Sequence, residues 1–186
     1  TLVLLIFLVI FFFYFYLPSE KNKNISKEIT TSDQNQITQS KNKNVFENVE
    51  YISTDSSGRK ITTRASLSYF FQEKPEIIYL ENPYSFTLMK DKTLLEIRSK
   101  SGEFNKITRN ATYRESVVIT NKNYIINCLE AMYIVKKNLI KLNGEVVIQD
   151  PPNKIFSDRA TLDTITNHAE AFMNSPNDRV LSQKYK

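Results

Sequence analysis

Few side chains of this sequence could take part in nucleophilic or metal chemistry, because the chain has one cysteine and one histidine. Cys128 lies in an apolar run, residues 124–129, which predicts a small buried side chain and not a reactive thiolate. His168 follows the polar segment 164–167, which predicts an exposed turn residue. A metal centre or a Cys–His pair needs several such side chains to converge on one point, so neither is expected.

The carboxylates show no catalytic pattern either. Asp158, Asp163 and Glu170 are expected on solvent-facing strand or turn positions. A membrane-anchored carbohydrate-processing enzyme would need a pair of carboxylates in a cleft, and no such pair stands out. The sequence also has no Gly-rich phosphate loop, no G-x-S-x-G and no H-E-x-x-H. We therefore predict a protein that is not an enzyme and has no cofactor.

The charge of the chain is mildly positive. Its 25 basic and 20 acidic residues give a net charge of +5 and lie interspersed along the sequence. Nucleic-acid binding is not predicted, because it requires basic residues concentrated on one face, and the basic residues here are dispersed. A weak attraction to anionic lipid head groups agrees with this charge.

The N-terminal segment, residues 1–17, is predicted to be a single transmembrane helix. Residues 2–17 are apolar or aromatic and carry no charge, and a spanning helix needs about twenty such residues. Because the sequence begins at Thr1, we expect further residues before it. A cleaved signal peptide is the alternative, but no A-x-A pattern follows. Both interpretations of the segment imply that the C-terminal side is exported. Lys21, Lys23 and Lys27 follow the segment and weakly oppose this, because positively charged residues usually stay on the cytoplasmic side of a membrane.

The remaining residues divide into a linker and a domain. Residues 18–44 are almost entirely polar and are predicted to form a flexible linker. From Val45 to Lys186 apolar and polar residues alternate, as in Ile61, Thr63, Ala65, Leu67 and Tyr69. This period of two predicts half-buried antiparallel strands, and turn-forming residues separate the runs. The domain is therefore expected to be all-β.

An internal repeat defines the expected architecture. Its template is Ile, any, small, any, any, Gly or Ala, any, large apolar, and its copies begin at Ile97, Ile126 and Ile155. The spacings are 126 − 97 = 29 and 155 − 126 = 29 residues, enough for one strand pair. Stacked pairs bury the apolar face that one pair cannot bury alone. We predict an open, elongated β-jellyroll or sandwich whose small residues let the strands bend or the layers approach, and whose open edges suit β-strand addition.

Four segments in this order resemble the LptC family. They are Asn48–Tyr51, Gly58–Ala65, Leu142–Ile148 and Ile155–Leu162. The resemblance implies an inner-membrane, single-pass protein whose open β-jellyroll lies in the periplasm. It further implies that the domain receives lipopolysaccharide from the inner-membrane ABC transporter and passes it to an LptA-like periplasmic protein. In this interpretation the acyl chains lie in an apolar groove.

Two sets of residues are candidates for these roles. The residues expected to face the lipid groove are Ile61, Ala65, Leu67, Ile97, Ser99, Phe104, Ile126, Cys128, Tyr133, Ile155, Ser157 and Leu162. The residues expected at the edges that pair with partners are Val45, Val49, Tyr51, Ala171, Met173 and Val180. The alternative is a membrane-anchored structural or adhesive β-repeat module with a closed interior and no lipid cargo.

Overall fold

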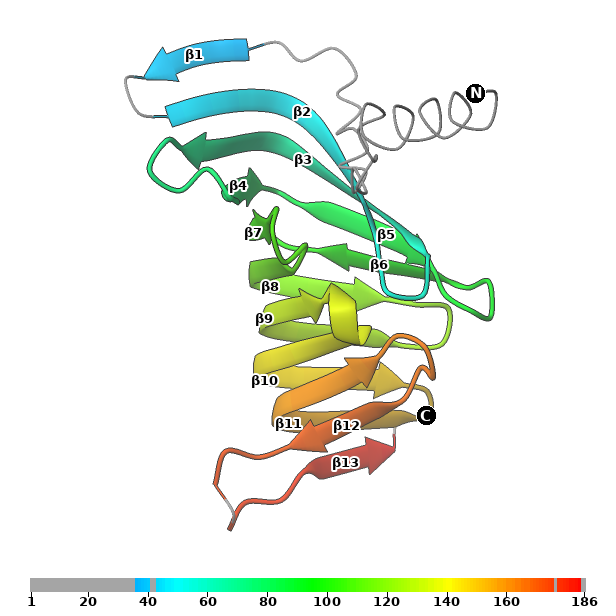
Figure 1. Cartoon of the computed structure of the whole chain (residues 1–186). Helices are drawn as coiled ribbons and strands as arrows, with labels where there is room; N and C mark the ends of the chain where they lie inside the picture. The colour runs from blue at the N-terminus through cyan, green and yellow to red at the C-terminus, as the bar shows by residue number, and fades with distance from the viewer. Residues whose placement is uncertain (1–35, 41–42, 176, 185–186) are drawn as a thin grey trace, which may run out of the picture.

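The computed structural model describes residues 36–40, 43–175 and 177–184, which form an all-β domain (Figure 1). The strands are β1 (Gln36–Ser40), β2 (Lys43–Thr54), β3 (Lys60–Phe71), β4 (Ile77–Glu81), β5 (Tyr84–Leu88), β6 (Leu94–Arg98), β7 (Ser101–Asn105), β8 (Ala111–Thr120), β9 (Ile125–Ile134), β10 (Leu139–Asp150), β11 (Asn153–Asp163), β12 (Ala169–Phe172) and β13 (Leu181–Lys184). A short 3-10 helix, η1 (Val135–Lys137), joins β9 to β10. The prediction of an all-β fold is confirmed.

All strand pairs are antiparallel and belong to one 13-stranded sheet. Its main path runs β1-β2-β3-β4-β7-β8-β9-β10-β11-β12, while β5 and β6 lie between β3 and β8 and β13 pairs with β11. Each strand therefore pairs with neighbours that are close in sequence. This order gives the elongated stack of strands seen in Figure 1, in which the chain adds one strand after another.

The sheet is folded along a line that crosses its strands, here called the corner. β8 pairs with β7 through residues 111–114 and with β6 through residues 118–120. β11 likewise pairs with β12 near one end and with β13 near the other. The strands that bend at the corner therefore contribute to two half-sheets. Half-sheet A contains β1, β4, β7 and β12, and half-sheet B contains β5, β6 and β13. β2, β3, β8, β9, β10 and β11 cross from one to the other.

Residues with positive φ produce the bends. The corner positions with left-handed backbone are Asn48, Asn82, Glu115, Ser116, Gly144 and Glu145. The pairing register shifts between Arg114 and Val117 of β8 and between Asn143 and Val146 of β10. Two residues of one strand there face one residue of its neighbour, which is a β-bulge and sharpens the local bend.

The small residues of the sequence repeat lie on both sides of this corner. Cys128 and Ala131 of β9 are three residues apart, yet both are buried at 5% and 0% exposure. On a regular strand they would face opposite sides, so the bend restores the inward direction. Ser157 and Ala160 of β11 repeat the arrangement, at 6% and 1% exposure. The inference that these small residues permit bending agrees with the structure.

Because the bend changes which side chains face the interior, the prediction that Leu67 faces inward is wrong. Leu67 follows the corner of β3, and there Ser68 is fully buried while Leu67 is only half-buried. Leu67 belongs to neither apolar cluster of the domain. The prediction for Leu67 requires inward and outward side chains to alternate without interruption along β3. The bend interrupts that alternation.

The boundaries of the sheet also differ from the expected ones. β1 and the first residues of β2 lie within 18–44, the range assigned to the linker, so the sheet begins before residue 45. β2 pairs with β3 along its length, whereas β1 pairs only with residues 43–46 of β2, so the edge prediction for Val45 is wrong. Among the described residues, the stretch of β2 that contains Val49 and Tyr51 pairs with β3 alone and is an edge, although both side chains are buried. At the other end Ala171 lies in β12, whereas Met173 and Val180 lie in the segment that joins β12 to β13.

The predicted transmembrane helix at residues 1–17 lies outside the described residues. Within the part of the chain that the structure describes, no helix has the length and apolar character required to cross a membrane.

Gly102 tests how tightly the corner is packed. A Cβ atom on Gly102 would lie 2.8 Å from the backbone oxygen of Thr112 and 3.1 Å from Cγ of Pro83. We expect Gly102→Ala to lower the free energy of unfolding by about 2 kcal/mol, because a backbone atom of the paired strand would have to move. Lys100→Ala, at an exposed position of the same corner, should change it by less than about 0.5 kcal/mol. Urea denaturation of both variants gives the comparison, and equal effects would contradict close packing at Gly102.

Candidate functional site

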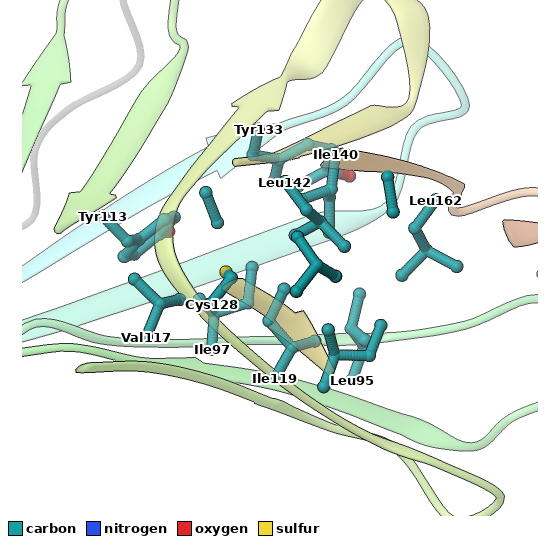
Figure 2. Packing of buried hydrophobic residues seen from close by; sticks show 14 of the residues in the cluster. Leu95, Ile97, Tyr113, Val117, Ile119, Cys128, Tyr133, Ile140, Leu142 and Leu162 are labelled. Atoms are coloured by element: carbon teal, nitrogen blue, oxygen red, sulfur yellow. The ribbon is translucent and has the colours of Figure 1, made fainter. Parts of the chain in front are cut away.

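The candidate site is the apolar interior between the two half-sheets. Half-sheet B contributes side chains such as Ile97 and Ile119, and half-sheet A contributes Tyr133 and Leu162 (Figure 2). These four side chains are between 0% and 3% exposed. Each half-sheet therefore covers the apolar face of the other, in one cluster that extends from β3 to β11.

Most of the predicted groove residues lie in this interior. The buried ones are Ile61, Ala65, Ile97, Ile126, Cys128, Tyr133, Ser157 and Leu162. Ser99, Phe104 and Ile155 are half-buried, and Leu67 lies outside the clusters, as described above. The repeat thus brings residues from three copies of one template into a common space. Their burial is equally what a structural core requires, so it does not assign them a role in lipid binding.

A second, smaller cluster continues the interior toward β2. It consists of Val49, Tyr51, Ala65, Ile78 and Leu80. Phe104 of β7 packs against both clusters and stacks on Tyr51, with ring centroids 6.0 Å apart. The apolar side chains therefore form a continuous path along the stack from β2 to β11.

The protein's own side chains fill this path. The hollow that reaches it beside Ile61, Leu95 and Tyr133 has a volume of about 10 Å³, room for about one water molecule. Two larger hollows of about 420 and 260 Å³ lie at the surface, beside Arg64 and beside Lys90. An acyl chain could enter the interior only if the half-sheets moved apart or side chains rearranged.

Polar groups inside the interior are neutral and mostly paired. The hydroxyl of Tyr113 donates to Oγ of Ser85 at 2.6 Å, and Ser85 is 2.7 Å from the hydroxyl of Thr63. Burial raises the pKa of Tyr113 to about 12. Burial likewise raises the pKa of Cys128 to about 12, so this thiol stays protonated at neutral pH and is a poor nucleophile. The hydroxyl of Ser157 is buried without a partner.

The open side of the folded sheet, opposite the corner, is here called the mouth, and a polar clasp closes part of it. The clasp consists of Asp55, Arg59 and Thr164. Arg59 forms a salt bridge with Asp55 at 2.7 Å and donates to the backbone oxygen and Oγ1 of Thr164 at 2.6 and 2.7 Å. The Asp55 and Arg59 side chains are 0% and 14% exposed. The turn between β2 and β3 is thereby bound to the turn after β11, which lies 105 residues away in sequence.

A second bridge crosses the mouth next to the clasp. The hydroxyl of Tyr124, the residue before β9, donates to Oδ1 of Asn167 at 2.9 Å. The hollow of about 260 Å³ lies beside it, lined by residues 89–91 of the β5–β6 turn and 165–167 of the β11–β12 turn. The clasp and this bridge hold the two half-sheets together at their open ends.

The clasp was not predicted from the sequence. The composition Asp-Ser-Ser-Gly of residues 55–58 indicates a turn, but not the contact that this turn makes. The bond from Arg59 to Thr164 depends on how the two ends of the stack approach each other, which no local pattern encodes. The expectation that His168 is exposed agrees with the structure, where its side chain is 70% exposed. Among the described residues no group of three or more His, Cys, Asp or Glu could hold a metal ion.

Comparison with known proteins decides the family. The model of the family described as "Lipopolysaccharide-assembly, LptC-related" matches residues 2–171. The chain belongs to the LptC family. No curated protein matches the sequence at a significant level.

A solved structure supports the fold. The domain is similar to the crystal structure of LptH from Pseudomonas aeruginosa, described as the LptA-homologous periplasmic component of the conserved lipopolysaccharide transport device. The two share 13% sequence identity with a TM-score of 0.53, over 68% of this chain and 95% of LptH. At this identity the likeness establishes the fold alone. Membership of the LptC family, together with this fold, supports a role in lipopolysaccharide transport and a periplasmic domain.

Removing the cation of the clasp should destabilise the domain. Arg59→Met leaves the fully buried carboxylate of Asp55 without its partner, and we expect a loss of about 3 kcal/mol in the free energy of unfolding. The control is Arg64→Met, because Arg64 pairs with Glu50 while 59% exposed and should cost less than about 1 kcal/mol. The double variant Asp55→Asn/Arg59→Met should lose less than Arg59→Met alone. Equal losses for Arg59→Met and Arg64→Met would show that the clasp does not hold the mouth.

The buried Cys128 predicts a loss of stability at alkaline pH. Its folded pKa of about 12 lies above its ordinary value of 9.0, so the unfolded chain loses this proton first as the pH rises. Stability should therefore fall between about pH 9 and pH 12. Cys128→Ala should show a shallower fall in thermal unfolding measured over this range. A wild-type protein whose thiol reacts with iodoacetamide at pH 8 as fast as the unfolded chain would contradict the burial of Cys128.

Proposed function

We propose that the domain carries lipopolysaccharide by holding its acyl chains between the half-sheets. The observation that supports this most directly is the continuous apolar interior from β2 to β11, which contains no charged side chain among its members. Acyl chains need only an apolar lining, which a neutral interior provides without catalytic groups. LptC family membership supports lipopolysaccharide as the cargo.

Entry of the lipid requires the half-sheets to separate, because side chains fill the interior of the closed domain. The mouth is where separation costs least, since it contains turns and a few side-chain bonds and no continuous pairing of strands across the opening. In the proposed mechanism the clasp opens, acyl chains replace part of the packing between the half-sheets, and the sugars remain outside. The corner remains intact throughout, because its strands are continuous.

The two ends of the stack are the proposed sites of transfer. We propose that the domain receives lipid from the inner-membrane ABC transporter near β1, and passes it to an LptA-like protein near β12 and β13. Among the described residues, β12 and β13 pair with β11 alone, so their outer backbone groups are available for strand addition. Ala171 lies on this edge, and Met173 and Val180 flank it. The N-terminal segment is proposed to anchor the chain in the inner membrane with the domain in the periplasm.

A structural or adhesive module is the second candidate function. The filled interior favours it, because a module of this kind needs no space for cargo. The two candidates differ in whether lipid ever reaches the interior.

Photo-crosslinking distinguishes them. A photoreactive residue is placed at Phe104, Tyr133 or Leu162, which lie in the interior, or at Arg98 or Arg159, which are exposed. In cells, crosslinks to lipopolysaccharide are expected at the three interior positions and not at the two exposed ones. Circular dichroism of each purified variant checks that it remains folded. Folded variants that give no interior crosslink would contradict lipid carriage and favour the structural module.

A further inference from the structure

The turns around the centre of the mouth carry an excess of positive charge, here called the basic rim. On half-sheet B the β5–β6 turn contains Lys90 and Lys92, and the β8–β9 turn contains Lys122. On half-sheet A the β7–β8 turn contains Lys106 and Arg109, and η1 contains Lys136 and Lys137. All seven side chains belong to exposed residues, and Asp91 is the acid within these four turns.

The turns of the basic rim are held next to each other in pairs. On half-sheet B, Nδ2 of Asn121 donates to Oγ1 of Thr93 at 2.8 Å and so connects the β8–β9 turn to the β5–β6 turn. Hydrogen bonds from Thr93, and then the charge of Lys122, hold the pKa of Asp91 below its usual value. On half-sheet A, the backbone N–H of Val135 donates to Oδ1 of Asn110 at 3.2 Å. The lysines therefore lie on both sides of one opening.

Three arginines on the strand faces form salt bridges with neighbouring carboxylates. Arg64 pairs with Glu50, Arg98 with Glu96, and Arg114 with both Glu103 and Glu130. No salt bridge between described residues involves a member of the basic rim. Like charges that are close together and unpaired repel each other, and they attract an anion that approaches the opening. Exposed lysines outside the rim, such as Lys100 and Lys141, also form no salt bridge with a described residue. What distinguishes the rim is that seven such cations lie around one opening.

The apolar and charged surfaces meet at the hollow of about 260 Å³ beside the rim. Met89 and Ile165 contribute apolar surface to it, and Lys90, Thr166 and Asn167 contribute polar groups. The carboxylate of Asp91 also lines the hollow, so a phosphate is expected nearer the cations of the rim than this acid. A lipid whose chains lie between the half-sheets has its head group at this level. We propose that the basic rim binds the phosphate groups on the head group of an anionic cargo lipid and so selects phosphorylated lipid; this inference rests on the proposed function.

The test compares one lipid with and without its phosphates. The full chain, with a photoreactive residue at Tyr133, is titrated in detergent with lipid A or with dephosphorylated lipid A of the same acyl composition. The readout is the lipid concentration that gives half of the maximal crosslinking. We expect this concentration to be about tenfold lower for the phosphorylated lipid at low salt, and the difference to shrink at high salt.

Matched charge reversals locate the effect. The rim variant is Lys90→Glu/Lys122→Glu/Lys137→Glu, and the control is Lys100→Glu/Lys141→Glu/Arg159→Glu, which reverses the same number of exposed basic residues at the corner and on the outer face. The rim variant should lose the preference for phosphorylated lipid and keep its crosslinking with dephosphorylated lipid. The control variant should keep the preference. Equal losses in both variants would show an effect of net charge and overturn the inference.

Two further outcomes would overturn it. If the wild-type chain crosslinks both lipids at equal concentrations, lipid carriage stands and the basic rim has no role in selection. If the rim variant loses binding to phosphatidylglycerol vesicles while it keeps its preference for phosphorylated lipid A, the rim binds the membrane surface and not the cargo. Absence of crosslinking with either lipid in the folded wild-type chain overturns the proposed function, and the inference with it.

Discussion

The bend at the corner is the constraint on which the rest of this structure depends. A single antiparallel sheet has two faces, and the described residues contain no helix other than the three-residue η1 that could cover one of them. By bending at a common level, β8 to β11 place the two halves of one apolar face against each other. The cost is a set of residues with positive φ, among them Asn82, Glu115, Ser116 and Glu145. Burial of side chains such as Ile119, Ile140 and Val146, each 0% exposed, offsets that cost.

The separation of charge follows from the same geometry. Inward positions receive apolar or neutral polar side chains, so the ionised groups are confined to the outer faces, the corner and the mouth. On the outer faces they form exposed pairs, such as Arg64 with Glu50, which contribute little stability. At the mouth the Asp55–Arg59 pair is buried and fully hydrogen-bonded, and it connects parts of the chain that no strand pairing connects.

Patterns within short stretches of the sequence predicted the strands and the stacking of the sheet, but not the contacts between distant turns. The alternation of apolar residues and the spacing of 29 residues were sufficient for the strands, their antiparallel stacking and most of the interior residues. The prediction for Leu67 was wrong because a bend shifts the alternation by one residue, and Leu67 lies outside the three copies of the repeat. The edge assignment of Val45 was wrong because β1 is mostly polar and its sequence resembles a linker. The clasp was missed because it depends on the path of the whole stack.

The order of the strands has a consequence for the length of the molecule. Because each 29-residue unit pairs only with its neighbours, whole units could be added or removed without altering the pairing inside the others. Each unit adds two strands, which lengthens the stack by roughly 10 Å. The bond between Arg59 and Thr164 does not scale in this way, since it joins two turns at a fixed separation along the stack. The clasp can therefore form only in a domain of this length. A domain with fewer or more units could keep its sheet and its interior, but it could not keep the bond between Arg59 and Thr164.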